Sequence, residues 1–287
     1  MAHEPGTSAP MSSMRAAATS RSGWAVVTGA SSGLGREFAL ALGKRGYPVL
    51  AVARRGERLS ALAAEVEEGG GRLEPLVADL STPAGIDALL ERAAERDVEL
   101  LVNNAGVASY GPFASAPAER QRGLVRLNVE TVVALTRGIL PQMLTRGRGG
   151  VINVASQMAF QPMPYFAAYA ASKAFVLSFS EALTEELRGT GVTVTAVAPG
   201  FVSTEFTEVA GSGEPERRLP HLQPRRVVES GLRAHDRGRT VTVVGRFYEF
   251  LTFAGRLAPR AFLRRMMGRL LRPAPAPPSP SPAAPQP

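Results

Sequence analysis

A tyrosine and a lysine four residues apart are the pair most suited to chemistry in this sequence. The chain has 33 basic residues, yet only Lys44 and Lys173 are lysines, and Lys173 follows Tyr169 in the stretch YAASK. If residues 165–189 form a helix, the two side chains lie on one face, one turn apart. A phenol has a pKa near 10, which a neighbouring ammonium lowers by stabilising the phenolate. The spacing therefore predicts a tyrosine that exchanges protons near neutral pH. The alternative is a surface tyrosine and lysine on a helix.

A glycine-rich turn offers a second kind of chemistry, which is anion binding. The stretch TGASSGLG, residues 28–35, follows the first apolar segment and precedes a predicted helix. Glycines at Gly29, Gly33 and Gly35 permit a tight turn and a close approach of backbone to a ligand. The N–H groups at the start of the helix then favour an anion such as a pyrophosphate. A tight strand-to-helix connection without a ligand is the alternative, but the place after the first strand favours a dinucleotide.

Short apolar segments alternate with helical ones along most of the chain. We expect strands at 24–28, 48–53, 73–78, 99–102, 151–155, 192–198 and 240–244. We expect helices at 33–45, 56–68, 82–96, 118–146, 165–189 and 225–236. This alternation is typical of a parallel sheet, and strands without clean alternation are covered on both faces. The pattern predicts an α/β fold with a doubly wound, seven-stranded parallel sheet of the Rossmann type and helices on both faces.

The end of the second predicted strand indicates which dinucleotide would bind. A site for NAD usually has an acidic residue there, about 20 residues after the glycines, to hold the ribose 2′-hydroxyl. This chain has Ala53 followed by Arg54 and Arg55. A guanidinium binds a phosphate as a fork, so the pair favours the 2′-phosphate of NADP(H) over NAD(H). The alternative is two solvated arginines at the start of a helix.

Composition divides the chain into four parts. Residues 1–22 lack the apolar stretch of a signal peptide and are predicted to be a disordered arm, with Met11 or Met14 as alternative starts. Residues 23–245 would form the sheet domain, 246–272 a basic helical extension, and 273–287 a disordered Pro-rich tail. The absence of cysteine suits a reducing compartment, so we expect a cytoplasmic protein. No apolar run reaches the roughly 18 residues of a membrane span.

Motifs in a fixed order give the chain a family resemblance. From about residue 24 to 204 it resembles the short-chain dehydrogenase/reductase family, in its classical subfamily. The matching positions are Thr28, Gly29, Gly33 and Gly35 in the glycine loop, Asp79 in VADL, NNAG at 103–106, Asn128 in RLNVET, Ser156, Tyr169, Lys173, Pro199, Gly200 and Thr204. Seven such motifs in register make the resemblance specific.

The resemblance implies a role for each catalytic residue. Tyr169 would be the general acid for carbonyl reduction or the base for alcohol oxidation, and Lys173 would hold the nicotinamide ribose and lower the tyrosine pKa. Ser156 would hydrogen-bond the substrate oxygen, and Asn128 would support a water-linked proton relay. Cofactor contacts would come from Gly29, Ser31, Ser32, Gly33, Leu34, Gly35, Arg54, Arg55, Asp79, Asn104, Ala105, Gly106, Tyr169, Lys173, Pro199, Gly200, Val202 and Thr204. No metal is implied.

Two of these assignments have structural alternatives. The resemblance gives Asp79 a contact with the adenine ring, but the following residues, LST, also suggest a helix start that Asp79 would cap. Asn104 would chiefly bind the backbone of neighbouring strands.

The substrate side is expected to be apolar. The stretch QMAFQPMPYF, residues 157–166, follows Ser156 and would line the pocket with Met158, Phe160, Met163 and Phe166. The alternative is that some of these only pack the loop. The resemblance also implies that the Gly- and Pro-rich segment 205–224 forms a lid over the substrate site. An apolar pocket favours a lipophilic carbonyl compound or alcohol, such as a long acyl chain, a steroid or a terpenoid ketone.

The basic extension is amphipathic. Phe262, Leu263, Met266, Met267, Leu270 and Leu271 fall on one half of a helical wheel, and Arg264, Arg265, Arg269 and Arg272 on the other, with only Arg260 on the apolar side. Pro259 should divide the segment into two helices. Such a helix could lie peripherally on the inner face of an anionic membrane, or its apolar face could cover the cleft or join a subunit of a homo-oligomer. Nucleic acid is not expected, because no binding motif accompanies the arginines.

These observations predict an NADP(H)-dependent oxidoreductase that interconverts a ketone or aldehyde and an alcohol. The alternative is a catalytically silent NADP(H)-binding module that senses redox state or scaffolds partners. Such a module would tolerate loss of the tyrosine or lysine, and both are present.

Overall fold

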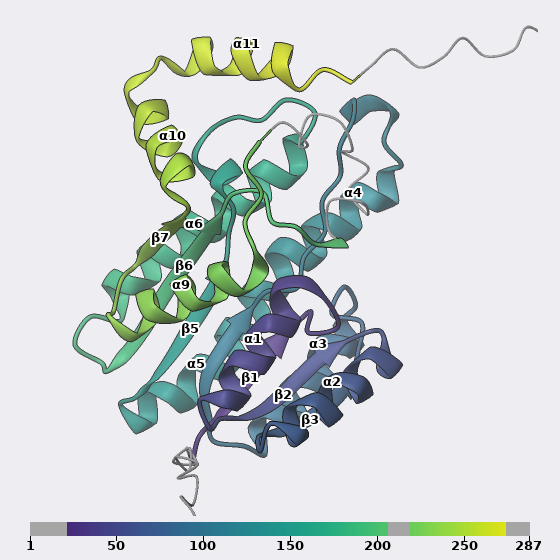
Figure 1. Ribbon diagram of the computed structural model, residues 1–287, viewed down its shortest axis with the longest axis vertical. Coiled ribbons are helices and arrows are strands. Elements are labelled where there is room, and N and C mark those ends of the chain that lie inside the picture. The colour runs from purple at the N-terminus through teal and green to yellow at the C-terminus, as the bar shows by residue number, and fades with distance from the viewer. Residues whose placement is uncertain (1–21, 206–218, 274–287) are drawn as a thin grey trace, which may run out of the picture.

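One seven-stranded parallel sheet forms the centre of the molecule (Figure 1). The computed structural model describes residues 22–205 and 219–273. The strands are β1 (Trp24–Thr28), β2 (Pro48–Ala53), β3 (Arg72–Val77), β4 (Val98–Asn103), β5 (Gly149–Val154), β6 (Val192–Pro199) and β7 (Val241–Val244). Their order is β3-β2-β1-β4-β5-β6-β7, and every neighbouring pair is parallel. The doubly wound sheet expected from the sequence is confirmed.

Helices cover both faces of this sheet. They are α1 (Gly33–Lys44), α2 (Gly56–Glu68), α3 (Pro83–Ala94), α4 (Ala118–Val125), α5 (Thr131–Arg146), α6 (Ala167–Glu186), α9 (Pro224–Asp236), α10 (Arg246–Leu257) and α11 (Arg260–Leu270). Apolar residues of α1, α2 and α9 pack on one face, and those of α3 and α5 on the other. Successive β1 residues point to opposite faces, so Val26 joins one core and Val27 the other. Burial on both sides explains why the strands are apolar throughout.

The strand order reverses between β1 and β4. From β1 the chain moves outward through β2 and β3, then returns to the other side of β1 at β4. In such sheets the loops after these two strands separate, one towards each face, and leave a crevice at their carboxyl ends. The topology therefore places the ends of β1 and β4 at a binding crevice.

The predicted helix over 118–146 is interrupted. A π-helical turn, Arg126–Glu130, separates α4 from α5, and Asn128 lies within it, fully buried. Such turns are rare in proteins, and those that do occur are frequently found at functional sites. The sequence pattern did not predict this turn. A π-helical turn adds only one residue to a helix, so the spacing of apolar residues before and after it still resembles that of one continuous helix.

The chain ends in two helices beyond the sheet. Gly245, with φ of 102°, turns the chain from β7 into α10, and Pro259 precedes α11. The break expected at Pro259 is confirmed. Both helices lie at the end of the molecule opposite the start of β1 (Figure 1). The predicted disordered arm and Pro-rich tail lie outside the described residues, apart from residues 22 and 273.

Candidate active site

A cleft opens at the carboxyl ends of the central strands and collects most of the predicted site residues. It is lined by Gly29, Ser31, Ser32, Gly33, Leu34, Arg54, Arg55, Asp79, Asn104, Ala105, Gly106, Ser156, Met158, Phe166, Tyr169, Lys173, Pro199, Gly200, Val202 and Thr204. Gly35, Asn128, Phe160 and Met163 lie elsewhere. These four were predicted for cofactor, relay or substrate contact.

The glycine loop has a shape that side chains would fill. Gly29 and Gly33 have φ angles of +67° and +54°, in the left-handed region that favours glycine. A Cβ on Gly35 would lie 2.2 Å from the carbonyl oxygen of Gly29 and 2.5 Å from Nδ2 of Asn104. The loop is thus pressed against the chain that follows β4. This bare-backbone cradle, with the start of α1 beside it, fits the pyrophosphate of a dinucleotide.

Hydrogen bonds tie the glycine loop to the loop after β4. Oγ1 of Thr28 accepts from the backbone N–H groups of Asn104 (2.9 Å) and Ala105 (3.0 Å). The Asn104 side chain donates to the carbonyl oxygen of Thr28 at 2.8 Å. Binding of neighbouring backbone, the alternative expected for Asn104, is what the structure shows, although Asn104 also lines the cleft. Two of the crevice's walls are therefore held together by residues of the family motifs.

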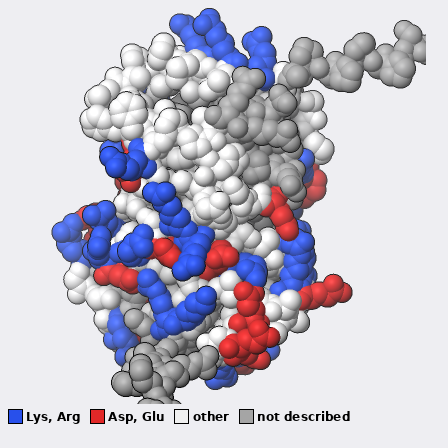
Figure 2. Space-filling view, viewed as in Figure 1, with Lys and Arg blue, Asp and Glu red and all other residues white. Residues whose placement is uncertain are grey.

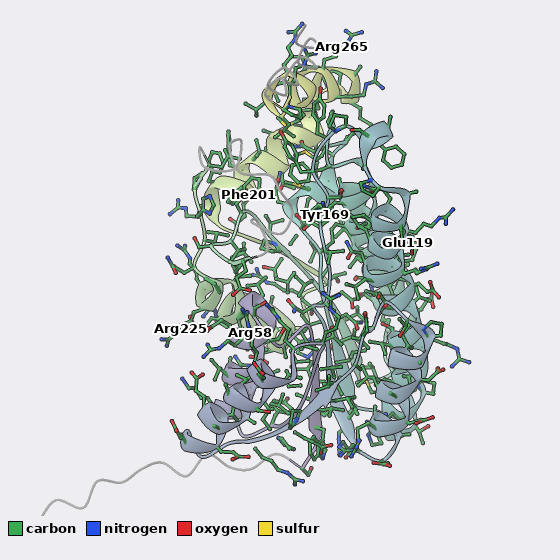
Figure 3. The ribbon with its side chains drawn as sticks, turned by 90° about the vertical axis from the view of Figure 1, so that its right-hand side faces the viewer. Arg58, Glu119, Tyr169, Phe201, Arg225 and Arg265 are labelled. Carbon is green, nitrogen blue, oxygen red and sulfur yellow. The ribbon has the colours of Figure 1, made fainter. Side chains whose placement is uncertain are left out.

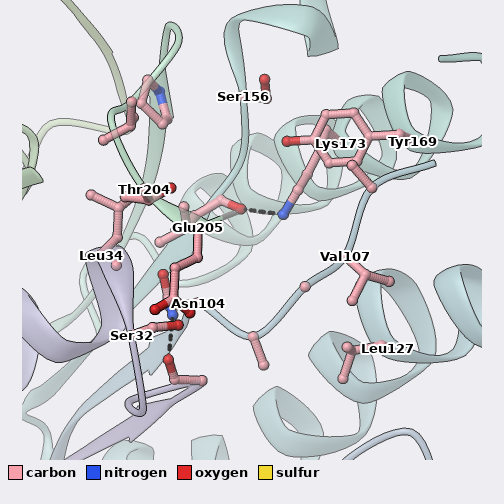
Figure 4. A pocket seen from close by; sticks show the side chains of 18 of the residues that line it. Ser32, Leu34, Asn104, Val107, Leu127, Ser156, Tyr169, Lys173, Thr204 and Glu205 are labelled. Carbon is pink, nitrogen blue, oxygen red and sulfur yellow. Dashed lines mark hydrogen bonds between the residues drawn. The ribbon is translucent and has the colours of Figure 1, made fainter. Parts of the chain in front are cut away.

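Ser156, Tyr169 and Lys173 meet on the other side of the cleft, and all three are at most 8% exposed. In Figure 4 the Tyr169 hydroxyl lies between the Ser156 hydroxyl and the Lys173 ammonium. Oγ of Ser156 accepts from the N–H of Met158 at 3.1 Å, which leaves its own proton available for donation. Nζ of Lys173 lies 6.0 Å from the centre of the Tyr169 ring.

Lys173 is held in place by the sheet. Its Nζ donates to the carbonyl oxygen of Val154, at the end of β5, at 2.7 Å. Burial removes water from the ammonium and lowers the pKa of Lys173 to about 8. The amine is consequently a compact positive charge whose position is fixed beside the tyrosine.

Asn128 supports the site from behind the cleft wall. Its Nδ2 donates to the carbonyl oxygen of Val107 and to Oγ of Ser172, at 2.9 and 3.0 Å. Its Oδ1 accepts from the N–H of Val107 at 2.9 Å. A Cβ on Gly106 would lie 3.1 Å from Oδ1 of Asn128 and 3.4 Å from Nζ of Lys173. Asn128 thus joins the loop after β4 to the helix that carries Tyr169 and Lys173.

Asp79 lies in the cleft but does not cap a helix. Its Oδ1 accepts from the N–H and hydroxyl of Ser81, at 3.0 and 2.7 Å. The N-cap of α3 is Thr82, whose side chain accepts from the N–H of Gly85. Burial tends to raise the pKa of Asp79, but the Ser81 hydrogen bonds and the Arg54 charge outweigh it, so its pKa is lowered. Asp79 stays an ionised acceptor at the cleft wall.

Arginines and serines form an anion site at the end of β2. Arg55 donates to the hydroxyls of Ser31 and Ser32 at 3.1 and 2.7 Å. The carboxylate of Glu205 accepts from Arg55 at 3.1 Å and from Arg58 at 2.8 and 2.9 Å. Hydrogen bonds from Arg58, then from Arg55, hold the pKa of Glu205 below its ordinary value. A carboxylate of the chain therefore already occupies a place suited to an anion.

Arg58 was missed by the sequence reasoning, although the run RRGER contains it. The first turn of α2 brings Arg58 beside Arg55. The prediction covered only the residues directly after the second strand, so it did not include Arg58. Gln157 and Phe201 also line the cleft without having been singled out. Nε2 of Gln157 is buried and has no hydrogen-bond partner among the described residues.

The apolar residues after Ser156 divide between two places. Met158 and Phe166 line the cleft, whereas Phe160 packs with the cluster around Val176. Met163 lies with Met158 and Phe166 in a cluster that also contains Tyr169 and, from the end of the chain, Met267 and Leu271. The carbonyl oxygen of Leu271 accepts from the hydroxyl of Tyr110 at 2.8 Å. Met267 and Leu271 thus pack on the cluster that supports Tyr169, whereas no described residue beyond Glu205 lines the cleft itself.

Comparison with known proteins agrees with this geometry. Residues 23–215 match the family model for short chain dehydrogenase. The chain is 45% identical over 188 residues to an uncharacterized oxidoreductase of Myxococcus xanthus, covering 64% of this chain and 73% of that protein. It is 37% identical over 189 residues to human 17-beta-hydroxysteroid dehydrogenase type 3, covering 64% of this chain and 61% of that protein.

A solved structure extends the likeness beyond the sequence motifs. It is a short-chain dehydrogenase from Sphingobium yanoikuyae in complex with NADPH, with a TM-score of 0.75 and 33% identity, covering 85% of this chain and 95% of that one. The family consists of oxidoreductases that act on alcohol and keto groups with NAD(P)(H). The protein described here belongs to the short-chain dehydrogenase/reductase family.

Proposed function

We propose that this protein is an NADPH-dependent reductase of lipophilic ketones or aldehydes, which also runs the reverse oxidation of the alcohol. One observation carries the proposal. Ser156, Tyr169 and Lys173 line the same cleft as the glycine loop, so a proton donor and a dinucleotide cradle face one space.

The residues of this cleft divide the work of carbonyl reduction. A bound reduced dinucleotide supplies a hydride to the carbonyl carbon, and the protein supplies a proton to the oxygen. Tyr169 donates that proton, because the Lys173 charge favours the phenolate that remains. The Ser156 hydroxyl donates a hydrogen bond to the substrate oxygen as negative charge develops there. Asn128 positions the loop and helix that hold these groups.

The anion site supports a preference for NADP(H). Arg54 and Arg55 follow the end of β2, where no carboxylate follows Ala53, and Arg58 lies in the first turn of α2. The Glu205 carboxylate is held by Arg55 and Arg58 in the manner expected of a phosphate. We infer that the cofactor's 2′-phosphate takes the place of this carboxylate. The NADPH in the Sphingobium relative is consistent with that preference.

The substrate side supports a large apolar molecule. The cleft is lined beside the catalytic groups by Met158, Phe166 and Phe201. Met267 and Leu271 pack in the same apolar cluster as these three residues. The human relative is named for a hydroxysteroid, which fits a rigid apolar ketone of steroid size. We infer that the reaction takes place in the cytoplasm, and a chain without cysteine is compatible with such a reducing compartment.

Turnover and binding measured together test the proposal. Purified protein is mixed with NADPH and a panel of steroid, terpenoid and long-chain β-keto acyl substrates, and absorbance at the nicotinamide band is followed. The proposal predicts turnover with at least one member and kcat/KM higher with NADPH than with NADH. NADPH binding with no turnover across the panel would favour the silent sensor or scaffold module.

A further inference from the structure

Helix α10 is turned with its apolar side outward. Its inner side buries Tyr248 and Thr252, which are 1% and 7% exposed. Phe250, Phe253 and Leu257, spaced by three and four residues, lie on the opposite side and are 69%, 62% and 75% exposed. A surface helix normally does the reverse, with its apolar stripe towards the core. Packing among the described residues does not account for the outward aromatic side.

Helix α11 divides its apolar half between the protein and solvent. Leu263 and Met267 are buried, as is Leu271 just after the helix, and Met267 and Leu271 belong to the cluster that supports Tyr169. The neighbouring stripe contains Phe262 and Leu270, which are 58% and 56% exposed, and Met266. Seven of the thirteen large exposed hydrophobic residues among those described fall in α10 and α11. These seven define the C-terminal face: Phe247, Phe250, Phe253, Leu257, Phe262, Met266 and Leu270.

Arginines surround the C-terminal face and have no acidic partners among the described residues. Residues 246–272 contain seven arginines and a single acid, Glu249. None of the seven forms an ion pair with a described carboxylate, whereas arginines elsewhere commonly do, as Arg36, Arg45 and Arg96 show. Figure 2 shows arginine side chains projecting where α11 lies, above a broad area without charged residues. Arg265 points away from the body, at the end above Tyr169 (Figure 3).

We propose that the C-terminal face binds the surface of a lipid bilayer that contains anionic lipid. The aromatic and aliphatic side chains enter the boundary between headgroups and acyl chains, while the arginines pair with lipid phosphates. The exposed apolar side chains and the arginines that bind such a surface are both present on α10 and α11. Among the described residues, no helix is both long and apolar enough to cross a membrane.

A second copy of the chain fits this face less well than a bilayer does. In a two-fold dimer the same patch meets itself, so the seven arginines of one copy would face those of the other with one acid on each side. Like charges brought together in this way repel. An anionic lipid surface supplies the negative charge that the described residues do not.

The position of the face connects membrane contact to the cleft. Helix α11 exposes Phe262 and Leu270 and buries Met267 on the cluster that contains Tyr169, where Leu271, just after the helix, is also buried. A bound bilayer would therefore lie next to the apolar side of the cleft. This last step rests on the proposed function, because it concerns delivery of a lipophilic substrate. The binding itself does not depend on it.

Vesicle flotation of the full chain tests the proposal. Two kinds of vesicle are used, phosphatidylcholine alone and phosphatidylcholine with phosphatidylglycerol. We expect flotation with the anionic vesicles and a loss of binding at high salt, because screening weakens the arginine contacts. The triple variant Phe250→Ser/Phe253→Ser/Leu257→Ser should bind anionic vesicles at least about tenfold more weakly. These side chains are exposed, so the variant should keep its melting temperature and its NADPH affinity.

Matched variants separate this face from general surface properties. Leu144→Ser removes an apolar side chain that is 38% exposed and lies near the start of β5, at the end of the molecule opposite α11, and it should leave flotation unchanged. Arg264→Gln/Arg265→Gln/Arg269→Gln should weaken binding to anionic vesicles. Arg122→Gln/Arg188→Gln/Arg225→Gln makes the same change in net charge at exposed sites elsewhere and should not.

The results have one interpretation each. Equal flotation of the α10 triple variant and the wild type would overturn the proposal, as would equal loss with both arginine triple variants. A different result would assign the face to a second copy of the chain. In that case the wild type sediments as a dimer and binds no vesicles, and the α10 triple variant sediments as a monomer. Because flotation needs no catalysis, inactive protein that floats would leave this proposal standing while the proposed function fails.

Discussion

Replacing Lys173 by methionine should make the protein more stable at neutral pH while removing its activity. Burial lowers the pKa of Lys173 from 10.5 to about 8, and each pKa unit is worth about 1.4 kcal/mol. The folded protein therefore carries a penalty of about 3 kcal/mol for the buried charge. Methionine removes the charge but also the hydrogen bond to Val154, at a cost of about 1 kcal/mol. The net expectation is about 2 kcal/mol of stabilisation at pH 7.

The pH dependence has a definite sign. The folded-state pKa lies below the unfolded value, so the penalty is fully present below pH 8 and disappears as the pH rises towards 10.5. The stability difference between Lys173→Met and wild type should shrink by about 2 kcal/mol between pH 7 and pH 9.5.

Urea denaturation of the cofactor-free protein at both pH values measures this difference. Lys44→Met is the control, because it removes the other lysine of the chain from an exposed position. It should change stability by less than about 0.5 kcal/mol. If Lys173→Met is less stable than wild type at pH 7, by an amount that does not depend on pH, the ammonium is not desolvated as described.

Two further predictions concern the cofactor side of the cleft. Glu205→Gln should tighten NADPH binding severalfold and leave NADH binding unchanged, because the charged competitor for Arg55 and Arg58 is removed; equal or weaker NADPH binding in a fluorescence titration would contradict this. Gly35→Ala should lower stability by about 1–3 kcal/mol and weaken NADPH binding, because the added Cβ would lie 2.2 Å from a backbone oxygen. Gly123→Ala, in open space on α4, is its control and should be neutral or stabilising in the same denaturation assay.

The sequence predicted the sheet and most of the cleft because both depend on local patterns. Apolar segments separated by helical ones imply a parallel sheet whatever the details of packing. The glycine loop and the Tyr169–Lys173 spacing then lie at fixed places in that sheet. The break at Pro259 was predictable for the same reason, since a proline without an N–H cannot continue a helix.

What the sequence did not predict depends on contacts between distant segments. Arg58 lies beside Arg55 because α2 begins at Gly56, and both arginines donate to Glu205, which comes from the other half of the chain. Met163 and Phe160 have the same apolar character as Met158, and only the fold decides which of them lines the cleft. The outward aromatic side of α10 was not predicted, because the spacing of apolar residues along a helix does not show which way they face.

The central claim is that Tyr169 donates the proton for carbonyl reduction. The most direct test is Tyr169→Phe, assayed for kcat with the best substrate and for NADPH affinity by fluorescence titration. The account predicts that kcat falls by at least about 100-fold, as expected for loss of a general acid, while NADPH affinity changes little. A variant that retains more than a tenth of wild-type kcat would show that the proton comes from elsewhere.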